Sequence, residues 1–293
     1  MTLSAKIIKD SLAPDGCRLT TFVLRYHRMV HAELMTHRAF SRNSSSSRAI
    51  PVKRMIEWVK EDPAVPVEWG KNQSGMQARE LLSPEDAAKA ELVWLEARDL
   101  MITKTQELID LNVHKQIANR LLEPWHHISV IVTATSYANW FGLRYHPDAQ
   151  PEIRDLAKLM AVAYLESNPR QVVYGQWHLP FVTIHELATL SVEEQIKLSV
   201  ARCARVSFNN HDGTASDPVK DVELHDKLAV QNPLHASPAE HQGTPISSGE
   251  DRALCGNFGR SWKQYRKTLP NECISELPWV KNPELLKELR AVV

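Results

Sequence analysis

The sequence predicts a globular protein of the α/β class, and three observations support this. The chain opens with an expected strand hairpin: AKIIKD (5–10) and RLTTFVLRY (18–26) flank a turn at 13–16, and the second segment is rich in β-branched and aromatic residues. A long helix with a complete start signal begins after Ser83. Capped helices return after residue 190, so strands and helices alternate within one chain of 293 residues.

The N-terminal half is predicted to continue mainly with helices. Residues 27–38 change to helical spacing, whereas 51–82 contain three prolines and predict an irregular excursion with short helical pieces. Ser83 is an expected N-cap and Pro84 the first position of a helix of about seven turns. We expect further helices at 115–122, from 126 towards 141, and at 151–166.

The chain changes character after residue 169. Residues 171–184 predict a strand and a loop, 191–206 a capped helix, and 217–231 another helix with Pro218 near its start. Glycine is scarce, at 10 residues, and neither G-x-G-x-x-G nor G-x-x-x-x-G-K-[ST] occurs. A nucleotide bound by this chain would therefore not be held by a Rossmann or P-loop turn.

The overall composition argues against several classes of protein. Lys and Arg number 35, as do Asp and Glu, and the pI near 7.2 disfavours a binder of nucleic-acid polymers or acidic membranes. No apolar run approaches the roughly 20 residues that span a bilayer, and the N-terminus lacks the apolar region of a secretory signal. The four cysteines form no C-x-x-C pair, so we expect a cytoplasmic protein with reduced thiols.

Metal and covalent chemistry have little support in the sequence. His31, Glu33 and His37 do not have the spacing of H-E-x-x-H, so we predict no metal site. No G-x-S-x-G occurs, and Cys203 is expected to be a buried helix residue rather than a nucleophile. The adjacent His126 and His127 are interpreted as capping or packing residues.

One short stretch stands out against the neutral background. MTHRAFSRNSSSSRAI (35–50) combines a histidine, three arginines, an asparagine and five serines. Guanidinium groups, hydroxyls and backbone amides suit phosphate oxygens, so this stretch is a candidate anion-binding loop. A solvated serine-rich connection is the alternative interpretation.

The pattern within this stretch is similar to a known signature. H-R-x-x-S-x-N-x-x-S-x-R (37–48) resembles R-H-R-x-x-S-x-N-x-x-S-x-R of the flavin-dependent thymidylate synthases. NWFGLRYHPDAQPEIRDLA (139–157) is similar to that family's N-F-x-x-L-R followed by A-Q-x-E-I-R. Arg120, in ANRLLEP, matches an arginine that helps to hold the substrate nucleotide in the family.

A third resemblance occurs at an unexpected place in the chain. In the family, A-R-V-S-Y, an acidic helix and H-x-S-P-F-E-H precede the R-H-R motif, whereas here CARVSF, DVELHDKL and LHASPAEH (203–241) follow it. The order implies a circular permutation, unless the short strings match by accident. A permutation implies one intertwined domain over 1–293, with the first two motifs in 1–168 and the ARVSF and HASPAEH motifs in 169–293.

The resemblance implies a fold, cofactors and a reaction. The implied fold is α/β (α+β), with a central, mostly antiparallel sheet and surrounding helices. The implied assembly is a homotetramer whose active sites are shared between subunits, with FAD bound. Reduced flavin, recharged by NADPH, would supply a hydride, and methylenetetrahydrofolate would supply the carbon added to C5 of dUMP without an enzymic nucleophile.

The resemblance also assigns roles to individual residues. Arg144 is the expected catalytic residue, because it would favour the N3-ionised base electrostatically. The expected substrate-binding residues, which include the phosphate-gripping ones, are Glu33, Ser44, Ser45, Ser46, Arg48, Arg120 and Arg144. The expected cofactor-binding residues, which would contact FAD, are Thr36, His37, Arg38, Asn139 and Ser237.

Several positions depart from the family pattern. Thr36 replaces the first arginine of R-H-R, Ser44 stands where an acid is usual, and Glu33 stands where the family has a glutamine. Thr133 and Thr135 lie in a stretch that elsewhere offers Asn and Arg to the flavin. Losing two cations weakens anion binding by roughly 1.5 to 3 kcal/mol for each charged hydrogen bond, unless Arg42 or Arg25 substitutes.

Four hypotheses therefore remain open. The first is a flavin-dependent thymidylate synthase acting on dUMP. The second transfers one carbon to another pyrimidine nucleotide, such as dCMP. The third is a flavin- or nucleotide-binding homologue without catalysis, and the fourth is an α/β protein whose serine-rich loop only connects helices. The segment 255–272 either covers the site or packs on a neighbour, and packing is favoured because aromatic and basic residues together are typical of surface elements.

Overall fold

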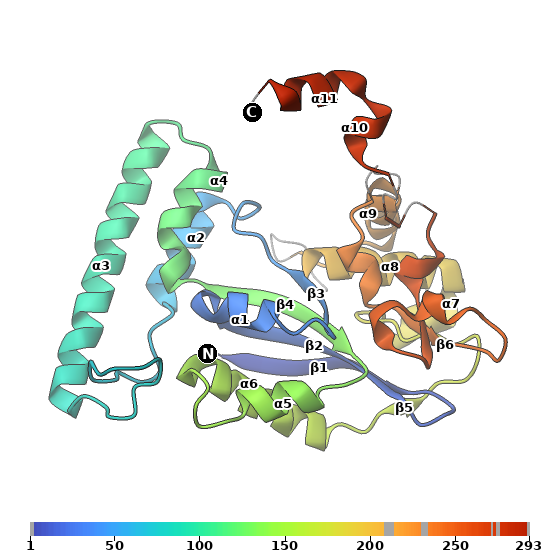
Figure 1. Cartoon of the computed structure of the whole chain (residues 1–293), viewed down its shortest axis with the longest axis horizontal. Helices are drawn as coiled ribbons and strands as arrows, with labels where there is room; N and C mark the ends of the chain where they lie inside the picture. The colour runs from blue at the N-terminus through green and yellow to red at the C-terminus, as the bar shows by residue number, and fades with distance from the viewer. Residues whose placement is uncertain (1–2, 208–213, 230–233, 271, 274–275, 292–293) are drawn as a thin grey trace.

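A five-stranded sheet forms the centre of the molecule. The computed structural model describes residues 3–207, 214–229, 234–270, 272–273 and 276–291 (Figure 1). The strand order is β3-β4-β2-β1-β5, and all neighbours are antiparallel except β1 and β5. The strands are β1 (Ser4–Leu12), β2 (Arg18–His27), β3 (Ser41–Ser44), β4 (His127–Ala134) and β5 (Arg170–Gln171). The predicted class, a mostly antiparallel sheet with surrounding helices, is confirmed.

The N-terminal hairpin forms as predicted. Strands β1 and β2 pair in an antiparallel register from Ser4 opposite Arg25 to Leu12 opposite Arg18. Gly16 occupies the turn with φ 82°, a conformation that glycine adopts without steric cost. The predicted helix over 27–38 is a short 3₁₀ turn, Arg28–Val30, followed by α1 (His31–Met35).

The helix predicted from 126 towards 141 is wrong over most of its length. Residues 127–134 instead form β4, which lies between β2 and β3, and only α5 (Ala138–Arg144) is helical. The sequence HISVIVTA is rich in β-branched residues, whose side chains fit a pleated sheet better than a helix. Almost every residue of β4 is buried, which is typical of a central strand.

The two faces of the sheet are covered by different parts of the chain. Alternate residues of β2 and β4, including Phe22, Leu24 and Val130, form the main core with α5 and α6 (Pro151–Glu166). On the other face, Val23 and Ile131 pack against Cys203 of α8 (Val192–Arg205), so the prediction that Cys203 is buried in a helix is confirmed. The period of two along each strand places consecutive residues in separate cores.

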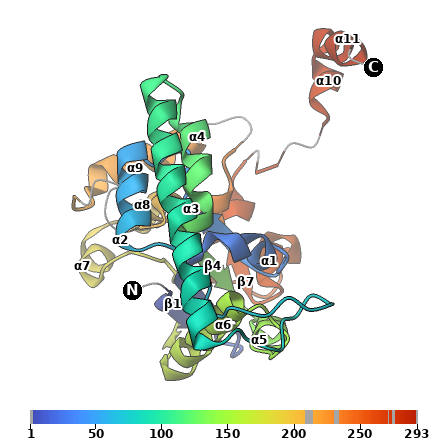
Figure 2. The same ribbon diagram turned by 90° about the vertical axis from the view of Figure 1, so that its left-hand side faces the viewer.

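A helical arm stands at one end of the sheet (Figures 1 and 2). It contains α2 (Val52–Glu61), α3 (Pro84–Asp110), α4 (Lys115–Ala118) and a 3₁₀ segment, Asn119–Trp125, that ends the helix predicted at 115–122. Ser83 caps α3 by accepting a hydrogen bond from the backbone N–H of Asp86 at 3.1 Å, as predicted. The indole of Trp94 donates to the carbonyl of Ala64, and the indole of Trp125 donates to the carbonyl of Trp94. These hydrogen bonds join α3 to the segments that follow α2 and α4.

Helices α7 (Ile184–Thr189), α8 and α9 (Pro218–Ala229) lie at the opposite end of the sheet from the arm, whereas α10 (Pro278–Lys281) and α11 (Pro283–Arg290) lie above the sheet in this view (Figure 1). The predicted capped helix is α8, with Ser191 and Glu194 in a reciprocal capping box. The expected strand in 171–184 is limited to Gln171, at the end of β5. The remaining elements are β6 (Gly243–Pro245), β7 (Trp262–Gln264) and 3₁₀ segments at Ser237–Glu240, Arg252–Phe258 and Tyr265–Thr268.

Packing is the observed role of much of the segment 255–272. Trp262 is fully buried, and it packs with Phe258 against Leu19 of β2. Phe208 of the ARVSF motif, residues 230–231 of the helix predicted at 217–231, and residue 271 lie outside the described residues. Among the helices that the structure describes, none combines the length and the apolar composition needed to cross a bilayer.

Candidate functional site

Four of the predicted site residues meet where α5 ends beside α1. Arg144 donates from Nη1 to Oε2 of Glu33 at 2.6 Å and from Nε to Nε2 of His37 at 3.0 Å. Its Nη2 makes longer contacts with the backbone oxygen of Glu33, at 3.5 Å, and the hydroxyl of Thr36, at 3.4 Å. Burial, with a smaller contribution from Arg144, lowers the pKa of His37 below its usual value, so the ring accepts this hydrogen bond as neutral imidazole.

This cluster borders a cavity of about 530 Å³, which we call the arginine cavity. Arg144 and Arg154 are its lining cations, whereas its lining acids are Glu33, Glu68, Asp148 and Glu152. Arg154 forms an ion pair with Glu68, and Glu152 accepts a hydrogen bond from the backbone of Val67 at 2.9 Å. Asp148 pairs with Arg79 at 2.9 Å and Glu33 with Arg144, so Glu152 is the lining acid without an ion pair among the described residues. Its charge makes the potential in this cavity unfavourable for an added negative charge.

The serine-rich loop is held against β4 rather than exposed as a linker. Its first part is β3, and the loop continues with a hydrogen bond from the backbone N–H of Ser45 to the carbonyl of Ser129 at 2.9 Å. The hydroxyl of Ser47 donates to Oε1 of Glu123 at 2.6 Å, and the same oxygen pairs with Arg120 at 2.8 Å. Glu123 therefore places Arg120 beside the serine loop.

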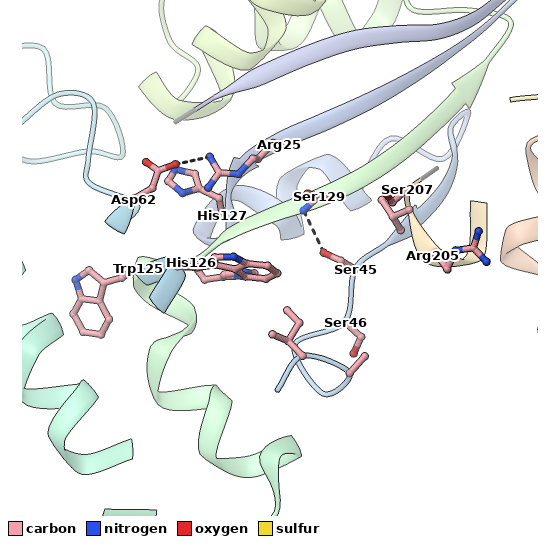
Figure 3. Close-up of a pocket in the computed structure, with 14 residues that line it drawn as sticks. Arg25, Ser45, Ser46, Asp62, Trp125, His126, His127, Ser129, Arg205 and Ser207 are labelled. Carbon is pink, nitrogen blue, oxygen red and sulfur yellow. Dashed lines mark hydrogen bonds and ion pairs between the residues drawn. The ribbon is translucent and has the colours of Figure 1, made fainter. Parts of the chain in front are cut away.

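A second cavity, of about 390 Å³, opens next to this loop (Figure 3). We call it the histidine cavity, and its volume is in the range of small-ligand sites. Four serines line this cavity: Ser45, Ser46, Ser129 and Ser207. Charged and aromatic side chains also line it, including Arg25, Trp58, Asp62, His126, His127 and Arg205. Arg25 forms an ion pair with Asp62 at 2.9 Å, and Arg205 forms one with Asp221 at 2.6 Å.

The histidines of this cavity are neutral and tightly packed. Burial is the main cause that lowers the pKa of His126 to about 4 and that of His127 to about 3. The ring of His126 stacks on Trp58 with 6.0 Å between centroids, and His127 lies 4.9 Å from His27. Nδ1 of His126 has no hydrogen-bond partner in the described part of the chain, although this side chain is only 4% exposed. A buried ring nitrogen at a cavity wall suits a ligand that supplies the missing partner.

The H-R-x-x-S-x-N motif meets the CARVSF and LHASPAEH segments at Asn43. Its Nδ2 donates to the carbonyl of Cys203 at 2.7 Å, and its Oδ1 accepts from the hydroxyl of Ser237 at 2.9 Å. One side chain of the H-R-x-x-S-x-N motif therefore binds both the CARVSF segment and the LHASPAEH segment. Neighbouring Ser41 also contacts the C-terminal half, through Asn257 at 3.1 Å.

Comparison with known proteins identifies the family. The model of the thymidylate synthase complementing protein family matches residues 18–169, which is just over half of the 293 residues. The chain belongs to this family. It is accordingly an enzyme of the methyltransferase type, and the resemblance of the motifs at 37–48 and 139–157, which lie within the match, is confirmed. The segments at 203–241 lie outside the match.

Similar solved structures include a UMP/dUMP methylase, PolB, from Streptomyces cacaoi. The structure bound with 5-Br UMP has a TM-score of 0.47 and 17% identity, and the match covers 56% of this chain and 89% of that one. The structure bound with 5-Br dUMP has a TM-score of 0.46 and 17% identity, with 56% and 90% covered. None of the curated proteins matches the chain significantly.

Two departures from the family pattern have a structural explanation in the buried core. Thr133 is fully buried, and its hydroxyl lies 2.8 Å from Nδ1 of His241 and 2.7 Å from the hydroxyl of Thr21. The hydroxyl of Thr135 donates to the carbonyl of Phe258 at 3.2 Å. These threonines therefore join the sheet to the C-terminal half.

The structure groups the predicted site residues into two sets. Glu33, Thr36, His37 and Arg144 cluster beside the arginine cavity, whereas Ser45, Ser46 and Arg120 lie beside or close to the histidine cavity. Ser44 ends β3, Ser237 contacts Asn43, and Arg38, Arg48 and Asn139 are exposed.

Motif analysis missed the cavity residues Trp58, His126 and Arg205 as site candidates. Trp58 belongs to a region outside the motifs, and His126 was interpreted as a capping or packing residue. The available signal was tryptophan: four of the chain's eight tryptophans lie between 58 and 125, a pattern that indicates a binding surface as readily as a core.

Proposed function

We propose that this protein is a flavin-dependent enzyme that transfers one carbon from methylenetetrahydrofolate to C5 of a pyrimidine nucleotide, with FAD and NADPH. The observation that carries the proposal is the meeting of Glu33, Thr36, His37 and Arg144 in one cluster. The family resemblance assigns two of these residues to the nucleotide and two to the flavin. Two pyrimidine nucleotides are candidates for the substrate. The first is dUMP, the substrate of the family, and the second is dCMP, because Glu33 is a carboxylate.

The phosphate of the nucleotide would bind beside the histidine cavity. Ser45 and Ser46 line this cavity, and the shared contact with Glu123 brings Arg120 close to the same loop. Hydroxyls, backbone amides and a guanidinium fork are suitable phosphate ligands. Arg48 is exposed on the same loop, so it can turn towards a bound anion.

The base would bind beside Arg144, which holds the pyrimidine edge and stabilises the charge that develops as C5 becomes nucleophilic. Neutral His37 fixes the guanidinium through Nε, so the terminal nitrogens keep their orientation. Because the serine loop and Arg144 line different cavities of one chain, a complete site would use the serine loop of a second copy. This arrangement supports the expected homo-oligomer, for which we propose a tetramer.

The residues expected to hold FAD are compatible with a flavin. His37, Arg38, Asn139 and Ser237 present ring, guanidinium, amide and hydroxyl groups, and the unpartnered Nδ1 of His126 offers a further site for a polar ligand atom. Bound flavin would supply the hydride that completes the methyl group. Thr36 adds a hydroxyl but no charge, so this chain holds the cofactor with one fewer cation than the family pattern.

We also propose that residues 1–293 form one intertwined, circularly permuted domain. The contacts of Asn43 with Cys203 and Ser237 support this, because they join the motifs of 1–168 to those of 169–293. The buried contact between Thr133 and His241 supports it further. In this view the protein is cytoplasmic, and its partners are a pyrimidine nucleotide and other copies of the chain.

A spectrum and a tritium-release assay test the proposal. The purified protein should show the absorbance of oxidised flavin, either as isolated or after soaking with FAD. With NADPH and methylenetetrahydrofolate, it should release tritium from a C5-labelled pyrimidine nucleotide. A colourless protein that takes up no flavin contradicts the proposal, and a flavin-binding protein that releases no tritium from dUMP or dCMP indicates a homologue without catalysis.

A further inference from the structure

Glu33 changes what Arg144 can offer to a substrate. The carboxylate binds Nη1 at 2.6 Å, and both side chains are largely sheltered, with 34% and 19% of their surfaces exposed. Each terminal nitrogen of a guanidinium carries two N–H groups, and Nη1 uses one of its two on Glu33. The two contacts of Nη2, at 3.5 and 3.4 Å, are long, so a ligand can replace them. The cluster therefore presents an acceptor from Glu33 beside two donors from Arg144.

This order of groups matches one pyrimidine better than the other. The pairing edge of cytosine presents an N4 amino donor followed by the acceptors N3 and O2, which complements an acceptor followed by two donors. Uracil presents acceptor, donor and acceptor, so at least one of its carbonyl oxygens faces the carboxylate or is left without a donor. An ionised glutamate cannot donate, whereas a glutamine in its place can offer its amide N–H to a carbonyl oxygen of uracil.

The surrounding charge favours the same base. Activation of uracil through its N3-ionised form places a negative charge beside Glu33, in a cavity that also contains Glu68, Asp148 and Glu152. Cytosine reaches C5 nucleophilicity through its N4 amino group, which becomes electron-poor as C5 attacks. A carboxylate that accepts from N4–H stabilises that developing positive charge.

We propose that Glu33 sets the base specificity of this enzyme, and that the preferred substrate is a cytosine nucleotide such as dCMP. The inference rests on the proposed function, because it places the base beside Arg144. The reaction balances as it does for uracil: C5 bonds to the methylene carbon of the folate, the C5 proton leaves, the bond between that carbon and the folate nitrogen breaks to release tetrahydrofolate, and a hydride from reduced flavin completes the methyl group. NADPH restores the flavin, so no further reactant is needed.

The test compares two substrates in two proteins. Tritium release from C5-labelled dCMP and dUMP is measured for the full-length protein and for Glu33→Gln, with Glu57→Gln on the exposed face of α2 as the matched control. We expect the unchanged protein to prefer dCMP by about 10-fold to 100-fold in kcat/KM, since one well-matched pair of hydrogen bonds discriminates by that factor. Glu33→Gln should reverse or abolish the preference, and Glu57→Gln should preserve it.

Binding measurements keep the inference testable without turnover. Calorimetry should show tighter binding of dCMP than of dUMP, with the ratio lost in Glu33→Gln and kept in Glu33→Asp, which retains the carboxylate. A preference for dUMP in the unchanged protein, or a ratio that Glu33→Gln leaves unchanged, overturns the inference but not the proposed function. If neither nucleotide binds or releases tritium, both are overturned.

Discussion

The two cavities differ in the charge of the side chains that line them. The arginine cavity has four lining carboxylates, of Glu33, Glu68, Asp148 and Glu152, against two arginines. In the histidine cavity both lining arginines are ion-paired, Arg25 with Asp62 and Arg205 with Asp221, and the histidines are neutral, so its lining carries no excess of negative charge. An anion therefore finds a better electrostatic environment in the histidine cavity, and a neutral base that donates hydrogen bonds finds one beside Arg144. The difference indicates that phosphate and base are bound by separate parts of the chain.

Removal of Arg144 should have the largest effect, because it eliminates the group that faces the base. Arg144→Ala should reduce tritium release from C5-labelled substrate by a factor on the order of 100 or more, as loss of an electrostatic stabiliser does in other enzymes. It also leaves Glu33 without its cation. The measurement is kcat for tritium release under saturating nucleotide.

Cys203→Ala is the control for this prediction. Cys203 is fully buried, and burial raises the pKa of its thiol well above the usual value, so it does not act as a nucleophile. We expect turnover to be retained in Cys203→Ala. Near-normal release in Arg144→Ala would contradict the role assigned to this arginine.

Acid should lower the free energy of unfolding through the buried histidines of the histidine cavity. The folded protein keeps His126 and His127 neutral, with pKa values of about 4 and about 3, whereas the unfolded chain takes up these protons below about pH 6.5. The unfolded state therefore binds more protons as the pH falls from 6.5 towards 4, and the free energy of unfolding decreases. The expected slope is up to about 1.4 kcal/mol per pH unit for each histidine.

Urea titrations at several pH values measure this slope. His127→Gln should flatten the dependence between pH 4 and pH 6.5, because one buried titrating group is removed. The exposed His185 provides the control, since His185→Gln should leave the slope as it was. An identical slope in His127→Gln would show that the acid sensitivity arises elsewhere.

Local signals explain which parts of the fold could be predicted. The hairpin, α3 and α8 have their turn and capping residues within a few positions, such as Gly16, Ser83 and Ser191, and α6 has a proline at its start, so the sequence alone specifies them. Strand β4 was missed because its apolar run fits a buried helix as well as a buried strand. Its assignment depends on pairing with β2 and β3, which lie some 100 and 85 residues earlier in the chain.

The site was predictable only where a motif marks it. The cluster of Glu33, His37 and Arg144 follows from motif positions, although the ion pair itself needed coordinates. The histidine cavity depends on Trp58, which a region outside the motifs brings onto His126. Such packing between distant segments leaves no spacing pattern in the sequence.

Asn43 connects the C-terminal half to the serine-loop strand, so its loss should weaken that connection. Asn43→Ala removes the hydrogen bonds to Cys203 and Ser237, so the Ser237 hydroxyl loses its acceptor, whereas the Cys203 carbonyl keeps its hydrogen bond from the backbone N–H of Val206. We expect a loss of about 2 kcal/mol in the free energy of unfolding, measured by urea denaturation at pH 7. Asn72→Ala, in an exposed loop, should change stability little. An Asn43 variant as stable as the parent would argue against one intertwined domain.

The smallest effect is expected from restoring the cation that the family has at position 36. Thr36 is exposed, and its hydroxyl donates to the carbonyl of Glu33 at 2.7 Å. An arginine here would stand beside Glu33 and compete with Arg144 for the carboxylate, which would partly free Arg144 for an anionic ligand. Exposed ion pairs contribute little, so we expect Thr36→Arg to tighten FAD binding by about fivefold at most. Flavin fluorescence titration measures this, with Thr36→Gln as the uncharged control. Equal FAD affinity in both variants would mean that the length of the side chain at position 36 matters rather than its charge. It would also mean that the acids of the arginine cavity already offset the charge that a cation adds at this position.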